Sequence, residues 1–90
     1  MLEKEIEDYF VWSVEMAGGK TWKFTSPAQR GVSDRIVCMP DGKVYFVELK
    51  KKGGKLSELQ KIFGAEMKRL NTNYEVLWSI EEIDKWIKRQ

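Results

Sequence analysis

The segment 34–50, DRIVCMPDGKVYFVELK, decides the fold, because it contains two β-rich runs joined by a tight turn. Residues 35–39 and 44–50 are rich in β-branched and aromatic side chains, which favour strands. Between them, Pro-Asp-Gly at residues 40–42 is typical of a hairpin turn. The segment therefore predicts a pair of antiparallel strands.

The type of turn determines which side chains of this hairpin face one another. In a three-residue connection, Gly42 adopts the left-handed conformation as a bulge and Met39 pairs with Lys43. This register brings the carboxylates of Asp34 and Glu48 opposite each other on one face. A two-residue type I′ turn would instead send them to opposite faces. The proline that opens the turn favours the three-residue form, so we expect a shared face.

Two opposed carboxylates repel each other, so the pair requires a compensating positive charge. Lys50 lies on the same face, diagonally from Asp34. One explanation is an ion pair between these two residues, with Glu48 pointing to solvent. The other is a divalent cation held by both carboxylates. The pattern alone leaves both explanations open.

The first predicted helix offers a third acid. Glu7 lies in its packed part, and Glu3 lies one turn earlier on the same flank. We expect Glu7 to be the acid that joins Asp34, Glu48 and a backbone carbonyl such as that of Leu49. These donors are all oxygen atoms, which suit Mg²⁺ or Mn²⁺ and not zinc.

Phosphodiester hydrolysis is the chemistry that such a site would perform. A bound metal ion polarises a phosphate and lowers the pKa of its bound water. Lys50 would orient that water or neutralise the charge that develops on the phosphate. The chain has no histidine, which excludes histidine-based nucleophilic pairs and histidine zinc sites.

The rest of the chain adds helices and strands on either side of the hairpin. Apolar residues recur at helical spacing in 2–17, 59–70 and 80–87, whereas 21–25 and 74–78 are strand-like. The predicted order is α-β-β-β-α-β-α, an α/β fold with a small mixed sheet flanked by helices on both faces. The second helix has an apolar stripe that we expect to face the sheet, at Leu59, Ile62, Phe63, Met67 and Leu70.

Length and composition indicate one compact domain. The chain has 90 residues, of which 42% are hydrophobic, so residues 1–90 form a single predicted domain. No apolar stretch approaches the ~20 residues that cross a membrane. The single cysteine, Cys38, has no partner for an internal disulfide. We therefore expect a soluble cytoplasmic protein.

The net charge is only +2, but the basic residues are unevenly distributed. Lysines at residues 50, 51, 52 and 55 form a cluster, which is either a solvated loop or a DNA contact. A second polar loop precedes the hairpin and provides another candidate contact with backbone phosphate. The residues that we expect to contact DNA are Ser26, Arg30, Lys51, Lys52 and Lys55.

Three motifs together resemble one nuclease family. They are GVSD at residues 31–34, VELK at 47–50 and LSELQ at 56–60. The combination is similar to the virus-type replication-repair nuclease (VRR-NUC) family of the PD-(D/E)xK nuclease superfamily, and the likeness runs through nearly the whole chain. One departure is Ser33, where many relatives have proline.

This resemblance implies a restriction-endonuclease-like core and a metal-dependent nuclease. Asp34 and Glu48 would hold the metal ion, and Lys50 would be the catalytic lysine. Gln60 would be the glutamine of the helical motif, and Glu7 the acid of the first helix. Gln60 also has a structural explanation, because with the serine three residues before it the glutamine forms a capping box.

The resemblance also implies a substrate and an assembly. Small proteins of this family look like dimeric Holliday-junction resolvases, so we expect a homodimer that cleaves branched DNA such as four-way junctions. A phage or prophage origin would place it in a bacterial host cytoplasm. The alternatives are a flap, fork or nonspecific DNA nuclease with the same residues, and a DNA-binding module that has lost catalysis.

The four tryptophans are many for so small a chain. We expect Trp22 and Trp78 to fill the core. Trp86, near the end of the last helix, is the predicted surface anchor of a dimer interface, because aromatic anchors are favoured there.

Overall fold

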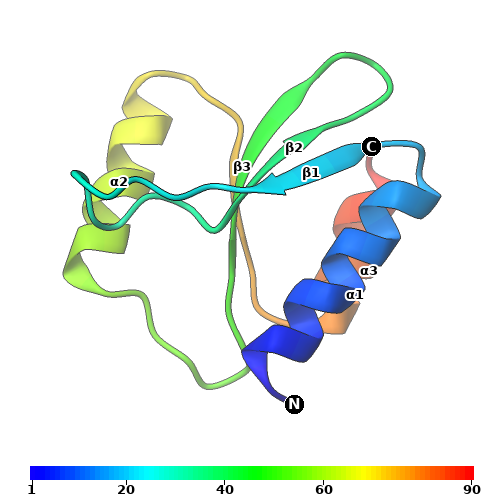
Figure 1. The fold of residues 1–90 in the computed structure, drawn as a ribbon, viewed down its shortest axis with the longest axis horizontal. Coiled ribbons are helices and arrows are strands. Elements are labelled where there is room, and N and C mark those ends of the chain that lie inside the picture. Colours follow the sequence, from blue (N-terminus) through cyan, green and yellow to red (C-terminus); the bar gives the residue numbers. More distant parts are fainter.

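The structure is a computed structural model that describes residues 1–90, and it has the predicted order of elements. A single sheet separates α2 from the pair α1 and α3, as Figure 1 shows. The elements are α1 (Glu3–Met16), β1 (Lys20–Lys23), β2 (Arg35–Cys38), β3 (Val44–Leu49), α2 (Glu58–Arg69), β4 (Tyr74–Leu77) and α3 (Ile80–Lys88). None of the helices is both long enough and apolar enough to cross a membrane.

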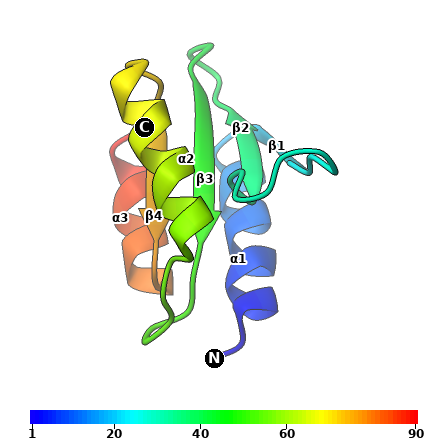
Figure 2. The same cartoon turned by 90° about the vertical axis from the view of Figure 1, so that its left-hand side faces the viewer.

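The sheet is mixed and has the strand order β1-β2-β3-β4. The first three strands are antiparallel neighbours, whereas β4 returns through α2 to lie parallel to β3. Figure 2 shows β3 at the centre of this arrangement, with α2 in front of it. The fold thus follows from two hairpin connections and one helical crossover.

The hairpin between β2 and β3 uses the three-residue turn. Met39 N donates to the carbonyl of Lys43 at 2.9 Å, and Gly42 N donates to the carbonyl of Met39 at 2.9 Å. Gly42 has φ 88°, the left-handed conformation that a bulge requires. Ile36 lies opposite Phe46, so the predicted register is confirmed.

The main core lies between the sheet and the helices α1 and α3. Trp86 of α3 is 1% exposed and packs against Phe10 of α1 and Tyr45 of β3, with ring centroids 5.7 Å and 5.1 Å apart. The buried hydrophobic residues are Ile6, Phe10, Val14, Val37, Met39, Val47, Leu49, Leu77, Ile83 and Trp86. The prediction that Trp86 is a surface anchor is therefore wrong.

The other face of the sheet is only partly covered, because α2 packs mainly over β4. Phe63 of α2 lies against Phe24, Phe46 and Tyr74, with ring centroids 6.0 to 6.4 Å apart. Gly64 is needed here, since a Cβ at this position would lie 2.9 Å from the ring of Tyr74. A small aromatic cluster therefore replaces an aliphatic core on this side.

Two predictions about this side are wrong. Trp22 was expected in the core but is 52% exposed, because α2 does not extend over the edge strand β1. The stripe of α2 was expected to face the sheet, but only Phe63 and Met67 are half-buried. The remaining residues of the stripe, Leu59, Ile62 and Leu70, are 45%, 60% and 53% exposed.

Candidate active site

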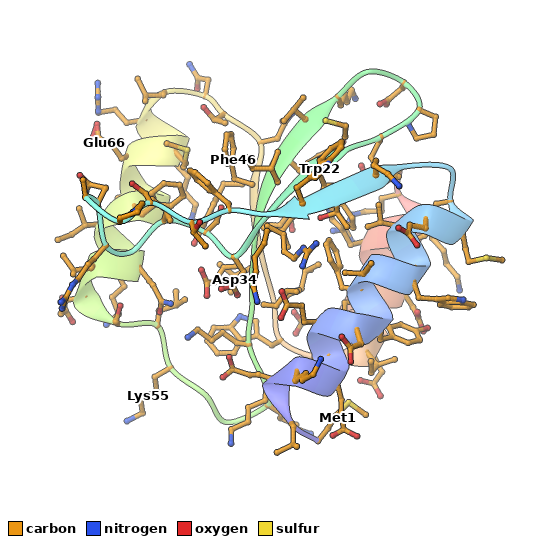
Figure 3. All side chains as sticks on the ribbon, in the orientation of Figure 1. Met1, Trp22, Asp34, Phe46, Lys55 and Glu66 are labelled. Carbon is orange, nitrogen blue, oxygen red and sulfur yellow. The ribbon has the colours of Figure 1, made fainter.

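Asp34 and Glu48 meet beneath α2, at the end of the hairpin farthest from its turn. The register of β2 and β3, continued by one residue beyond Arg35 and Val47, places the two carboxylates opposite each other. In Figure 3, Asp34 lies at the centre of the molecule, between α2 and α1. Asp34 Oδ2 accepts a hydrogen bond from Leu49 N at 2.9 Å, which ties Asp34 to the end of β3.

Glu48 is buried, with a relative exposure of 1%, so it does not point to solvent. Its Oε2 atom accepts a hydrogen bond from Gln60 Nε2 at 3.1 Å and lies 3.9 Å from Lys50 Nζ. Its Oε1 atom is buried and has no hydrogen-bond donor. Lysine and glutamine therefore hold one oxygen, and the other has no donor while both carboxyls are ionised.

The environment of Glu48 raises its pKa to about 8. The largest cause is burial, which disfavours the charged form, and the second is the charge of Asp34. A hydrogen bond to Asp34 acts in the same direction, because the pair can form it only when a proton lies between them. Lys50 opposes these effects. Without a cation, the pair therefore retains a proton near neutral pH.

Tyr74 is affected by the same site. Its pKa is raised to about 12, first by burial and then by the charges of Glu48 and Asp34. The negative potential of the carboxylate pair thus extends through the aromatic cluster beneath α2.

Gln60 forms the capping box that the sequence allowed, and its side chain also reaches Glu48. Its Oε1 accepts from Ser57 N at 2.8 Å and its backbone N donates to Ser57 Oγ at 3.1 Å, so the capping box is present. Its Nε2 group is the donor to Glu48. The cap fixes the side chain at the first turn of α2, where it reaches the carboxylate pair.

Gly31 joins the loop before Asp34 to the same turn of α2. A Cβ at this position would lie 2.5 Å from the carbonyl oxygen of Leu59, and Gly31 has φ 85°. Only glycine allows the loop to cross the helix so closely. The GVSD motif therefore places Asp34 and the start of α2 at fixed positions relative to each other.

Glu7 is held by an arginine that sequence analysis did not single out. Arg35 Nη1 donates to Glu7 Oε2 at 2.9 Å, and Arg35 Nε donates to Thr21 Oγ1 at 3.2 Å. The Arg35 side chain is only 12% exposed. Glu7 thus has one oxygen paired, whereas Glu3 is exposed and makes no ion pair. The pairing joins residues 28 positions apart, which no local pattern reveals.

A hollow of about 410 Å³ opens beside the carboxylate pair. It is lined by Glu3, Lys4, Glu7, Lys23, Asp34 and Leu49. Sequence analysis missed Lys4 and Lys23, because each is an ordinary exposed lysine in its own element. No three histidine, cysteine or acidic side chains gather closely enough to form a complete metal site by themselves.

The predicted DNA contacts lie around this site without joining it. Arg30, Lys51, Lys52 and Lys55 are exposed, and Ser26 is half-buried in the loop before β2. Lys52 lines a hollow, but a different one from the hollow beside Asp34. The structure thus places the predicted catalytic residues together and leaves the predicted DNA contacts distributed over two loops.

No protein-family profile matches the chain. The chain is 47% identical over 58 residues to the putative nuclease p44 of Acyrthosiphon pisum secondary endosymbiont phage 1. That match covers 64% of the chain and 62% of the relative, so the chain spans less than two thirds of the relative's length.

A solved structure described as a VRR_NUC domain is similar over nearly the full chain. The TM-score is 0.90 and the sequence identity 26%, with 96% of this chain and 94% of that chain covered. The resemblance drawn from the three motifs is therefore confirmed, and the chain has the fold of a VRR-NUC domain.

Proposed function

We propose that this chain is a metal-dependent DNA endonuclease that hydrolyses phosphodiester bonds in structured DNA. The observation that carries the proposal is the buried Glu48 carboxyl, which faces Asp34 and is held by Lys50 and Gln60. The VRR-NUC fold and the identity to a putative phage nuclease support it.

The residues of the site fit a hard divalent cation. Glu48 Oε1 is buried without a donor, and the Asp34 carboxylate lies beside it. A cation between them would replace the proton that the pair otherwise shares. Leu49 lines the hollow beside Asp34 and would provide its backbone carbonyl oxygen to the cation. Oxygen donors of this kind suit Mg²⁺ or Mn²⁺.

The third acid has two candidates with different surroundings. Glu7 keeps one oxygen for the site, because Arg35 occupies the other. This arrangement suits a carboxylate that binds a water molecule of the metal ion, with Arg35 as its positioning residue. Glu3 lies at the same hollow with no ion-pair partner, and is the second candidate.

The chemistry then follows from the side chains. When bound, the metal ion would supply Lewis acidity to the phosphate and lower the pKa of a water molecule. Lys50 would hold the attacking water and neutralise charge on the phosphate, since its ammonium group is already directed to Glu48. Gln60 would keep Glu48 oriented while DNA binds.

The surroundings of the site provide contacts for the DNA backbone. Lys23 and Lys4 line the hollow from β1 and α1, and Lys23 makes no ion pair. We add both to the predicted contacts Ser26, Arg30, Lys51, Lys52 and Lys55. Each basic contact neutralises phosphate charge, so together the lysines and Arg30 would give salt-dependent binding.

We further propose that the protein works as a homodimer on four-way junctions. Large apolar side chains are exposed on the α2 side of the molecule, including Trp22 and Ile62 at 52% and 60%. Such residues are typical of interfaces. A symmetric pair would present two sites to two of the four strands of a junction. The phage relative supports action in a bacterial host cytoplasm.

A cleavage assay on labelled four-way, forked and linear DNA, each with Mg²⁺, Mn²⁺ or EDTA, tests the function. We expect cleavage of branched DNA with either metal ion and none with EDTA. Glu48→Ala should remove cleavage, whereas Glu15→Ala, an exposed acid of α1, should retain it. Cleavage that persists in Glu48→Ala would contradict the proposal, and junction binding without cleavage by the wild type would indicate a binding module.

Sedimentation as a monomer at micromolar concentration would contradict the proposed dimer.

A further inference from the structure

A second hollow, of about 250 Å³, lies on the other side of the first turn of α1. Its apolar wall consists of Trp78, Ile80, Ile6 and Met1, and Lys52 stands at its edge. Trp78 is half-buried and forms no aromatic pair with any other ring of the protein. An aromatic ring beside a lysine thus remains available to a ligand.

Backbone segments that carry residues of the hollow also carry Lys50 of the candidate active site. Lys50 N donates to the carbonyl of Leu77 at 3.0 Å, and Trp78 is the next residue after Leu77. Lys52 follows Lys50 by two residues, a reach of at most about 7 Å. The first turn of α1 separates the two hollows, because Glu3 lines one and Met1 lines the other.

Two hydrogen bonds hold the backbone at Trp78. Trp78 N donates to Glu82 Oε1 at 3.1 Å, and Ser79 Oγ accepts from Glu82 N at 3.1 Å. These two bonds cap α3 and fix the backbone that carries the tryptophan. A preformed aromatic surface binds a planar group with little loss of conformational entropy.

We propose that this hollow binds an unpaired nucleobase of the DNA substrate, next to the phosphate that is cleaved. The base stacks on Trp78, and Lys52 pairs with the adjoining phosphate. Stacking on an aromatic side chain beside a basic group is the chemistry that recognises single-stranded nucleic acid. Ser79 and Glu81 provide polar atoms at the rim that can bond to a base edge.

This inference deepens the proposed function and rests on it, because it gives a reason for choosing branched DNA. A base at a fork or junction is already unstacked, so placing it in the hollow costs little. A base within a continuous duplex must first be removed from its stack, which costs free energy. The hollow would therefore favour branch points without reading their sequence.

The test is the affinity of the protein for forked and for fully paired DNA of equal length, measured by fluorescence anisotropy in EDTA. Trp78→Ala should weaken binding to the fork by roughly 5- to 150-fold, the range for loss of one stacked base. Binding to the duplex should change less than about twofold. Trp12→Ala is the matched control, because Trp12 is 56% exposed and lines a separate hollow between α1 and α3.

A change in the DNA gives the same information without a variant. Removing single bases from the unpaired arm should weaken wild-type binding at one position near the branch, and Trp78→Ala should be insensitive to that removal. Trp78→Phe should retain most of the affinity. Lys52→Ala should lower the slope of log K against log salt by about one.

Equal binding by Trp78→Ala and Trp12→Ala, or an equal loss on fork and duplex, would overturn the proposal. So would an abasic scan with no effect at any position, which decides the matter if Trp78→Ala fails to fold. A changed sedimentation coefficient in Trp78→Ala with unchanged fork binding would assign the hollow to a second copy of the chain. Because binding is measured without metal, fork preference without cleavage would refute only the nuclease activity.

Discussion

The two faces of the sheet differ in what they bury. The face toward α1 and α3 is completely apolar at its centre, with Phe10, Val47 and Trp86 at 0 to 1% exposure. The face toward α2 buries Glu48 at 1% exposure and leaves Trp22 and Ile62 exposed. Burying a carboxyl costs stability, and exposing tryptophan and isoleucine gains none. One face therefore stabilises the fold, and the other holds the candidate site.

A substitution in the candidate site should have the largest effect on cleavage. Glu48→Gln should lower cleavage by more than about 10²-fold, because even the partners of metal ligands contribute 10- to 100-fold. Chemical denaturation near neutral pH should show no loss of stability, since glutamine has nearly the same shape as the protonated carboxyl and is also neutral. Loss of stability with activity retained would mean that Glu48 has a purely structural role.

A substitution in the apolar core should do the reverse, lowering stability and leaving cleavage unchanged. Trp86→Ala should lower the free energy of unfolding by about 3 to 5 kcal/mol, the range for truncating a large buried aromatic residue. Cleavage per folded molecule should change little, because Trp86 does not line the site. Urea denaturation and an activity assay at low temperature would measure both. An unchanged midpoint would contradict the burial of Trp86.

Gly31 and Gly42 both have positive φ, but only Gly31 adjoins the candidate site. Substitutions of the two therefore separate backbone strain from an effect on the site. Gly42→Ala should cost about 1 to 2 kcal/mol from backbone strain alone, since nothing lies within 4 Å of its Cβ position. Gly31→Ala should cost more, because its Cβ would lie 2.5 Å from the Leu59 carbonyl oxygen. It should also lower activity by shifting Asp34 relative to Gln60. Equal effects of the two variants would contradict the role given to Gly31.

The buried carboxyl also gives the face toward α2 a pH dependence that the apolar core does not have. The pKa of Glu48 in the folded protein, about 8, lies above its ordinary value of 4.5, so the folded state binds the extra proton. The stability that Glu48 contributes is therefore fully present below pH 4.5 and is lost as the pH rises through about 8, by at most about 1.4 kcal/mol per pH unit. Urea midpoints at pH 5 to 8 in EDTA should show this slope in wild type and in Glu15→Gln. A Glu48→Gln variant with the same slope would contradict it.

The turn residues of the hairpin allowed the sequence to predict which side chains lie on the face toward α2. Pro40, Asp41 and Gly42 determine the register, and the register brings Asp34 to Glu48. The same local chemistry predicted the capping of α2, because a capping box requires only residues three positions apart.

The errors concern contacts that depend on where helices pack. Trp22, expected in the core, is exposed because α2 does not cover β1. Trp86, expected at the surface, is buried because α3 packs against the sheet and α1. Helical periodicity indicates that one stripe of a helix is apolar, but not how much of that stripe a short sheet covers. The pair of Arg35 with Glu7 joins β2 to α1, so it depends on tertiary packing and was missed.

The central claim is that Asp34 and Glu48 hold a divalent cation between them. Calorimetric titration of Mn²⁺ into the wild type, Asp34→Asn and Glu48→Gln at pH 8 tests it most directly. We expect saturable binding in the wild type and its loss in both variants. Binding that both variants retain would contradict the claim.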